Sequence, residues 1–367
     1  MSEEPVLPDY AGACVCNVVP ALLEASSDPV EWLPDFVHEA NQVVLLVIDG
    51  MGWEQLQARR SFAPVMTAMH GRAITTVAPS TTATALTSIA TGLTPGEHGV
   101  VGYRINVGGE ILNVLRWNTP NGDARLTIPP GSFQKAASFA SQHPPIVTRA
   151  EFHHGGFSGA HLEGTRFHGY RCMSTFLVEM RRLLRANEPF IYAYYDGPDK
   201  VSHEYGLGEH YDAEVAAVDR LVADIMDELP PGAVLVITSD HGQVHTGDAV
   251  HDLPTDVLEH VAIQSGEARL RWLHARGGRA NALLEAVDHH LGDLAWVRTR
   301  AQVIGEQWFG PHITLEGANR LGDVALAAKG VHAFLDPADS GPYKLIGRHG
   351  SLTSAEMLVP LLSHGRF

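Results

Sequence analysis

Basic residues are scarce in this sequence. Its 367 residues include 26 Lys and Arg against 42 Asp and Glu, a formal charge of −16 with 21 His counted as neutral. A chain this acidic lacks the positive surface that the phosphate backbone of DNA or RNA requires, and no local block of basic residues supplies one. We therefore do not expect a nucleic acid polymer as a partner.

Long apolar runs and cysteines are scarce as well. The longest runs, at 43–48 and 233–237, are far shorter than the roughly 20 residues that cross a bilayer, which argues against a membrane protein. The first ten residues, MSEEPVLPDY, have neither the basic region nor the apolar stretch of a secretory signal, so we expect a cytoplasmic protein. Three cysteines without a C-x-x-C spacing predict neither a disulfide framework nor a cysteine zinc site.

Three short apolar runs that are followed by acidic residues indicate the fold class. VVLLVI precedes Asp49, FIYAYY precedes Asp199 by a few residues, and AVLVITS precedes Asp240. Continuous apolar runs of this length are typical of strands buried on both faces, as in a parallel sheet flanked by helices. Helices are expected between them at 82–90, 174–186 and 211–229. The alternation predicts an α/β fold.

Two segments differ from this βα alternation. Residues 254–321 contain RLRWLHARGG and the helical NALLEAVDHHL, and motif-bearing segments lie on both sides of them. Residues 104–144 are rich in Gly, Pro and Asn, and INVGGEILNVLRW alternates like a hairpin. We interpret 1–367 as a single catalytic domain with an inserted lobe at about 254–321 and a minor insertion at about 104–144.

Carboxylates and imidazoles gather at the expected strand ends, where ligands bind in open α/β sheets. Asp49 follows the first run, and Asp240 and His241 follow the third. Asp199 and His203 are four residues apart, which places both side chains on one face of a helical turn. Such residues are typical metal ligands, although Asp-Gly and Asp-His-Gly also occur in ordinary turns. The pattern indicates a metal site only when the motifs are taken together.

Two further segments have an alternative structural explanation. His349, in RHGS, would by itself be a loop histidine. The segment 75–92 is rich in Thr and Ser and leads into a helical sequence. A hydroxyl such as that of Ser80 or Thr81 at a helix N-terminus is commonly a cap. It is a candidate nucleophile when a metal ion lies beside it, because the metal favours the ionised hydroxyl and the helix N–H groups bind phosphoryl oxygens.

Taken in order, these motifs resemble the alkaline phosphatase superfamily, and most closely its type I phosphodiesterases and nucleotide pyrophosphatases. The motifs are VIDGMG with Asp49, the Thr-rich segment, PDKVSHEYG with Asp199 and His203, SDHG with Asp240 and His241, and RHG with His349. The resemblance spans most of the chain. It implies a three-layer α/β/α fold with a mostly parallel central sheet, as in alkaline phosphatase.

The resemblance also implies roles for individual residues. One metal would be held by Asp49, Asp240 and His241, and a second by Asp199, His203 and His349. The family nucleophile lies three residues after a proline and nine before a Thr-Gly pair. Counting from Pro79 and from Thr91 gives Thr82 both times, with Thr81 as the alternative if the count is off by one.

The metals that the family implies are two Zn²⁺ ions. The residues support this independently, because a set of three Asp and three His suits Zn²⁺ better than Mg²⁺, which prefers oxygen ligands. The implied reaction is attack by Thr82 on phosphorus and hydrolysis of a covalent phosphothreonine or nucleotidyl-threonine intermediate. We expect cleavage of phosphodiester or pyrophosphate bonds in small phosphate esters or nucleotides. A phosphomonoesterase and a catalytically silent metal- or nucleotide-binding protein are the alternatives.

The sequence departs from the family pattern at two places. The family's phosphodiesterases have an Asn that contacts the phosphoryl oxygen where this chain has Tyr103. The Tyr103 hydroxyl would donate the same hydrogen bond, or the ring is a core or rim aromatic. The family's T-x-P-N-H sequence is replaced by TATALTS. An arginine that grips the phosphate cannot be located; Arg104, Arg116 and Arg348 are candidates by position, with a surface charge as the alternative for each.

Overall fold

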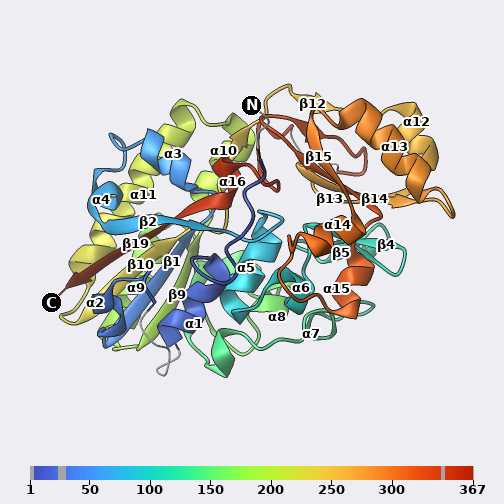
Figure 1. Cartoon of the computed structure of the whole chain (residues 1–367). Coiled ribbons are helices and arrows are strands. Elements are labelled where there is room, and N and C mark those ends of the chain that lie inside the picture. The colour runs from blue at the N-terminus through green and yellow to red at the C-terminus, as the bar shows by residue number, and fades with distance from the viewer. Residues whose placement is uncertain (1–3, 24–29, 340–343, 367) are drawn as a thin grey trace.

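A seven-stranded sheet forms the centre of the computed structural model, which describes residues 4–23, 30–339 and 344–366. Its strand order is β2-β19-β10-β1-β9-β7-β8, and Figure 1 shows β2, β19, β10, β1 and β9 side by side. Strand β19 runs antiparallel to both its neighbours, and the other strands run parallel. The strands are β1 Gln42–Ile48, β2 His70–Thr75, β7 Pro145–Arg149, β8 Arg166–Tyr170, β9 Phe190–Tyr195, β10 Ala233–Thr238 and β19 Leu358–Arg366. The predicted α/β fold with a mostly parallel sheet is confirmed.

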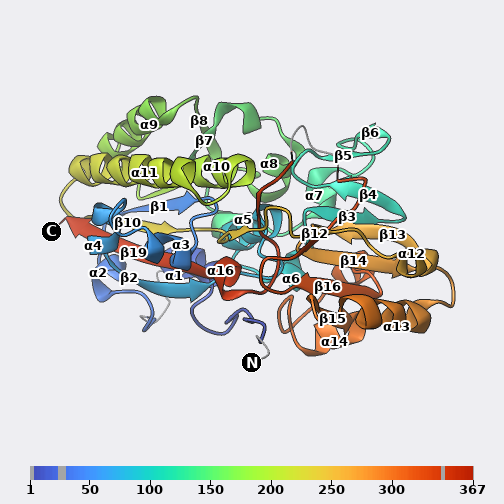
Figure 2. The ribbon, with the colours of Figure 1, turned by 90° about the horizontal axis from the view of Figure 1, so that it is seen from above.

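Helices cover both faces of this sheet because its central strands are apolar on both sides. In β1, Val43 and Leu45 belong to one buried cluster, and Val44 and Leu46 belong to another. The helices on the first face are α1 Val18–Leu23, α5 Thr82–Thr91 and α8 Gly156–His161. Those on the second face are α3 Trp53–Ala58, α4 Pro64–Ala68, α9 Met173–Arg185 and α11 Glu209–Glu228 (Figure 2). Helix, sheet and helix thus form three layers.

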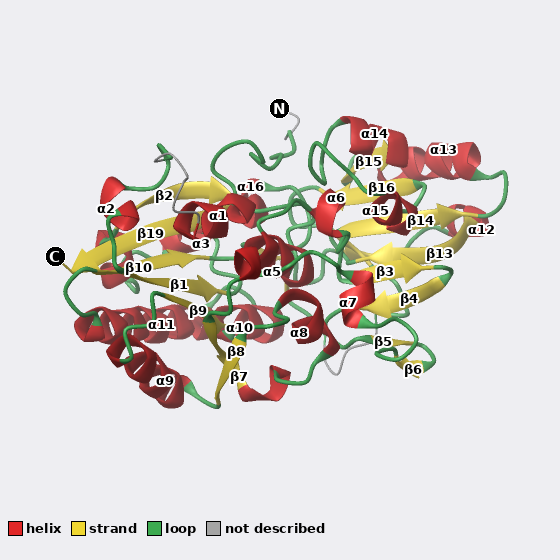
Figure 3. Ribbon diagram, turned by 90° about the horizontal axis from the view of Figure 1, so that it is seen from below, coloured by secondary structure: helices red, strands yellow, loops and turns green. Residues whose placement is uncertain are grey.

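A second sheet, which is antiparallel, lies beside the central sheet as a separate group of strands (Figure 3). Its order is β13-β14-β16-β15, and it has its own apolar cluster, which includes Leu273 and Leu326. The elements of this lobe are α12 Thr255–His260, β13 Val261–Gly266, β14 Leu270–Ala275, α13 Ala280–Leu291, β15 Ala295–Thr299, α14 Arg300–Gly305, α15 Leu315–Arg320 and β16 Val324–Ala328. Strand β16 lies beyond residue 321. The division into a catalytic domain and insertions stays an interpretation.

Smaller elements complete the described chain. A four-stranded sheet consists of β3 Arg104–Val107, β4 Glu110–Asn113, β5 Asn118–Thr119 and β6 Gly122–Asp123. The two-stranded pairs are β11 Val244–His245 with β18 Gly347–Arg348, and β12 Val250–His251 with β17 Ala333–Phe334. The short helices are α2 Asp35–His38, α6 Pro95–His98, α7 Pro130–Phe133, α10 Gly197–Tyr205 and α16 Ser354–Met357. Within the described ranges, no helix is both long and apolar enough to cross a bilayer.

Candidate metal centre

Neighbouring strands bring three aspartates to one edge of the central sheet. Asp49 follows β1, Asp240 lies two residues after β10, and Asp199 lies in the first turn of α10, which follows β9. Asp49 and Asp240 are buried. Burial raises the pKa of both carboxyls, and the charges of Asp240 and Asp199 raise that of Asp49 further. Such a buried group of acids favours a cation in its midst.

Three histidines at the same edge each engage one ring nitrogen with a backbone carbonyl. The Nδ1 atoms of His203, His241 and His349 lie 2.8, 3.0 and 2.9 Å from the carbonyl oxygens of Gly347, Gly242 and Ser80. A carbonyl oxygen only accepts, so each Nδ1 carries a proton, and in the neutral ring Nε2 is then the atom available to a metal. A hydrogen bond of this kind, on the ring nitrogen that faces away from the metal, orients metal-ligating histidines.

The free Nε2 atoms point at the carboxylates. His241 Nε2 lies 3.3 Å from Asp49 Oδ1 and 3.5 Å from Asp240 Oδ2. His203 Nε2 lies 3.2 Å from Asp199 Oδ1, and His349 Nε2 lies 3.7 Å from the same oxygen. All six sequence-predicted ligands therefore come together, although they are far apart in the chain.

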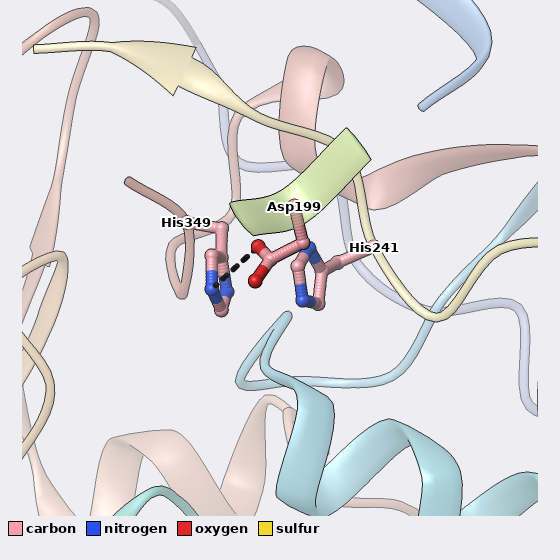
Figure 4. Close-up of side chains that lie close together, drawn as sticks. All are labelled: Asp199, His241 and His349. Atoms are coloured by element: carbon pink, nitrogen blue, oxygen red, sulfur yellow. Dashed lines mark ion pairs between the residues drawn. The ribbon is translucent and has the colours of Figure 1, made fainter. Parts of the chain in front are cut away.

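Two subsets are tight enough to hold an ion. The ligand atoms of Asp49, Asp240 and His241, the first triad, lie within 4.8 Å of one another, and so do those of Asp199, His241 and His349, the second triad. Figure 4 shows the side chains of the second triad turned toward one another. His241 belongs to both triads, whereas His203 lies beside Asp199 and belongs to neither.

Unpartnered atoms test whether these residues fit a metal. Asp49 Oδ1 and Asp240 Oδ2 are buried and have no hydrogen-bond partner among the described residues. They are the same oxygens that face His241 Nε2. Buried acceptors without a donor cost free energy, and a cation between them removes that cost. The site fits a divalent ion with nitrogen and oxygen ligands.

Thr82 is the candidate nucleophile whose hydroxyl reaches this cluster. It is the first residue of α5, and its Oγ1 lies 3.1 Å from His241 Nε2. Because that nitrogen holds a lone pair, the Thr82 hydroxyl donates. Thr81 is the N-cap residue and makes no side-chain cap; its hydroxyl lies close enough to the Glu267 carboxyl to lower the pKa of that group. The geometry thus distinguishes Thr82 from Thr81, the two candidate nucleophiles between which the sequence did not decide.

Side chains that sequence reasoning missed hold the carboxylates in place. The Tyr194 hydroxyl donates to Asp49 Oδ2, and Gln243 Nε2 donates to Asp199 Oδ1 at 2.6 Å. Tyr194 shares a face of β9 with Tyr192, and this alternation was the one available sequence signal for it. Gln243 follows the Asp-His-Gly motif without any pattern of its own.

A cavity of about 390 Å³ opens beside Thr82, Asp49 and Asp199. Its apolar lining includes Leu86, Leu115, Phe152, Phe157, Tyr192 and Tyr194, and its charged lining includes Arg116, Glu151, Asp196 and Lys200. Lys200 is paired with Asp196 at 2.6 Å. Arg116 is exposed and has no ion pair within the described part of the chain.

Tyr103 and Arg104, which the sequence suggested as phosphate contacts, lie outside the lining of this cavity. Tyr103 donates its N–H to Glu267 Oε2 at 3.0 Å, and its hydroxyl accepts from Asn113 at 2.6 Å. Tyr103 does not line the cavity. Arg104 is buried and pairs with Asp336 at 2.6 Å, so it is neither a surface charge nor a phosphate clamp at the cavity.

Glu267 is a buried carboxyl that the sequence did not point to. It lies in the turn between β13 and β14 and is 8% exposed. Burial raises its pKa to about 8, although hydrogen bonds from Tyr103 N–H and Thr81 oppose the rise. The carboxyl is therefore mostly protonated at neutral pH.

This pKa predicts a pH-dependent stability. The native state keeps the Glu267 proton up to about pH 8, whereas the unfolded chain releases it near 4.5. Stability is therefore lost as pH rises through this window, by up to about 1.4 kcal/mol per pH unit. Glu267→Gln removes this titration. The free energy of unfolding of the variant, measured with urea, should therefore rise relative to that of the wild type from pH 5 to pH 8. A constant difference over that range would contradict the shifted pKa.

Comparisons with known proteins identify the family and the fold. The family model described as type I phosphodiesterase / nucleotide pyrophosphatase matches residues 43–178 and 166–352. Murine ectonucleotide pyrophosphatase / phosphodiesterase 5 superposes with a TM-score of 0.67 at 15% identity, covering 88% of each chain. Phosphonoacetate hydrolase from Sinorhizobium meliloti 1021, in complex with phosphonoformate, superposes with a TM-score of 0.67 at 17% identity, covering 89% of this chain and 90% of that one. The comparison with curated protein sequences gives no match.

Proposed function

Because the chain belongs to the type I phosphodiesterase / nucleotide pyrophosphatase family, in the alkaline phosphatase superfamily, we propose that it hydrolyses phosphodiester or pyrophosphate bonds of small molecules in a metal-dependent reaction. One observation carries the proposal. The Thr82 hydroxyl lies 3.1 Å from Nε2 of His241, a residue that belongs to both triads, and Thr82 lines a cavity of about 390 Å³. A nucleophile, two candidate metal positions and room for a substrate are thus adjacent.

We propose two Zn²⁺ ions as the cofactors. One would be held by Asp49, Asp240 and His241, and the other by Asp199, His203 and His349, because the single Nε2 lone pair of His241 can serve only one ion. When bound, the ions would lower the pKa of the attacking hydroxyl and neutralise charge on the phosphoryl oxygens. The tautomers of the three histidines and the orphaned oxygens of Asp49 and Asp240 support this assignment.

Thr82 is the proposed nucleophile. Its Oγ1 forms a bond to phosphorus while the bond to the leaving oxygen breaks, which gives a phosphothreonine or nucleotidyl-threonine intermediate. Water then attacks phosphorus, breaks the bond to Oγ1 and restores the hydroxyl. The N-terminal N–H groups of α5, a helix of ten residues, face the anionic phosphoryl group.

The cavity supports a nucleotide-type substrate. Phe152 and Phe157 offer apolar surface for a flat ring, and Arg116 offers an uncommitted positive charge for a phosphate. Related folds bind small phosphorus compounds: an inactive variant of the murine protein is in complex with AMP, and the bacterial hydrolase with phosphonoacetate. The predicted phosphoryl contact of Tyr103 receives no support from its contacts with Glu267 and Asn113.

Paired substrates test this function. We expect hydrolysis of bis(p-nitrophenyl) phosphate with a kcat/KM at least about tenfold above that for p-nitrophenyl phosphate, since the cavity beside Thr82 takes a second ester group. A chelator should abolish both activities. Preference for the monoester would favour the phosphatase alternative, and binding of zinc without turnover of either ester would favour the silent binding protein.

The cytoplasmic location stays a prediction, which cell fractionation tests.

A further inference from the structure

One carboxyl side chain of the lobe, that of Glu267, packs against the catalytic part of the chain. Glu267 lies in the tight turn in which its own N–H donates to the Leu270 carbonyl at 3.0 Å. Its Oε2 accepts from the Tyr103 N–H, and its Oε1 is buried without a partner among the described residues. The charge of Arg271, in the same lobe, acts on this carboxyl, but Oε1 has no hydrogen-bond partner in the described part of the chain, and a buried polar atom without a partner calls for an explanation.

The contacts of Glu267 lie next to residues of the proposed reaction. One is the Thr81 hydroxyl, and Thr81 directly precedes Thr82. Another is Gly350, which directly follows His349. A Cβ placed at Gly350 would lie 2.6 Å from Glu267 Cγ, so the two residues are closely packed. A single side chain therefore touches both the nucleophile-bearing end of α5 and the loop that carries a candidate ligand.

A buried ion-pair network fixes the base of this turn. Arg271 of β14 is fully buried and donates to Asp339 and, at 3.0 Å, to the Phe334 carbonyl. Arg104, the neighbour of Tyr103, donates to the same Asp339 and to Asp336. The lobe strand and β3 thus share one carboxylate, which limits the movement of Glu267 relative to Tyr103.

We propose that Glu267 is a positioning residue, which holds Thr82 and the His349 loop in register with each other and so couples the lobe to catalysis. This inference rests on the proposed function. Glu267 acts through Thr81 and Gly350 and is not a metal ligand. A displacement of about 1 Å at a reacting atom is enough to cost on the order of 100-fold in rate. A side chain that holds two segments of the site therefore has a measurable effect on kcat.

Two substitutions separate positioning from charge. Glu267→Ala removes the acceptor for Tyr103 N–H and opens a gap beside Gly350. Glu267→Gln keeps the shape and an oxygen acceptor, and it is neutral like the protonated carboxyl. We expect Glu267→Ala to lower kcat by about 10- to 100-fold with KM within threefold of the wild type. Glu267→Gln should stay within threefold for both constants, and Glu285→Ala, an exposed lobe residue, is the matched control.

A binding measurement makes the test independent of turnover. Orthovanadate mimics the five-coordinate transition state, whereas inorganic phosphate mimics a ground state. In calorimetric titrations of the zinc-loaded variants, Glu267→Ala should weaken vanadate binding at least tenfold and phosphate binding less than threefold. Zinc content should be unchanged.

Several results would overturn the proposal. One is a Glu267→Ala variant that keeps the kcat and the vanadate affinity of the wild type. Another is a Glu267→Gln variant that loses as much kcat as Glu267→Ala does. The third is a Glu267→Ala variant that also loses phosphate affinity and zinc, because that result indicates general disruption. If the wild type binds vanadate but hydrolyses no ester, the proposed function is wrong. The vanadate and phosphate affinities of the Glu267 variants would then still test the positioning role. A wild type that binds neither anion contradicts both.

Discussion

Thr82→Ala is expected to lower kcat on bis(p-nitrophenyl) phosphate by at least about 10³-fold, the scale on which loss of a covalent nucleophile acts. Of the two candidate threonines, Thr82 is the one whose hydroxyl has a hydrogen bond to a candidate ligand atom, at 3.1 Å from His241 Nε2. Alanine is a good helix former, so α5 should keep its first turn. The loss should therefore appear in kcat and not in the folded fraction, measured by steady-state kinetics and thermal unfolding.

Three variants serve as controls for this result. Thr82→Ser keeps a hydroxyl and should keep a substantial part of the activity. Thr87→Ala removes a hydroxyl that bonds to the Ala83 carbonyl within the same helix, at 2.7 Å, and should leave kcat nearly unchanged. Thr81→Ala tests the neighbouring residue directly. Full turnover in Thr82→Ala together with loss in Thr81→Ala would move the nucleophile by one position.

The covalent intermediate gives a second measurement of the same step. Acid quenching during turnover should leave a phosphoryl or nucleotidyl group on the peptide that contains Thr82, detectable by mass spectrometry. The adduct should persist in Thr82→Ser, on the serine, and be absent from Thr82→Ala. Turnover without any adduct in the wild type would indicate direct attack by water and contradict the two-step reaction.

Removal of the metals is expected to lower activity by about 10³-fold or more, since charge neutralisation at phosphorus is worth several kcal/mol. It should also lower the melting temperature. Without a cation, Asp49 and Asp240 are buried side by side with raised pKa values, and each has an unpartnered oxygen. Dialysis against chelator, followed by re-addition of Zn²⁺, should restore both activity and melting temperature.

Zinc analysis of single variants assigns the ligands. Asp240→Asn and His349→Ala should each lose about one zinc per chain of the proposed two, because each residue belongs to one triad. His241→Ala should lose about one zinc as well, the ion held with Asp49 and Asp240, and His203→Ala should weaken the other ion, which Asp199 helps to hold. His251→Ala is the control, since His251 contacts His332 and not the cluster. Unchanged zinc content in Asp240→Asn or His349→Ala would contradict the ligand assignment.

The grouping of five expected ligands is the part of the site that local sequence anticipated, whereas His349 was included only through the family resemblance. Asp49 and Asp240 directly follow buried apolar runs, and adjacent parallel strands end at the same edge of a sheet. The four-residue spacing of Asp199 and His203 places both side chains on one face of α10. These relations depend on chain geometry over a few residues, so they can be read without a structure.

The tertiary structure decided what depends on contacts between distant segments. The Thr82–His241 pair spans 159 residues, the Tyr194–Asp49 bond 145 and the Tyr103–Glu267 bond 164. No local periodicity encodes such pairs, because they arise from how the layers and the lobe pack.

The charge of the chain illustrates the same division. Its excess of acidic residues by itself argues against polyanion partners, because net charge depends on composition alone. Composition does not reveal where those charges lie. The fold places Asp49, Asp199 and Asp240 within reach of three imidazoles at the edge of the sheet where their strands end together. A cation bound there would make this one place in an acidic protein attractive to a phosphate.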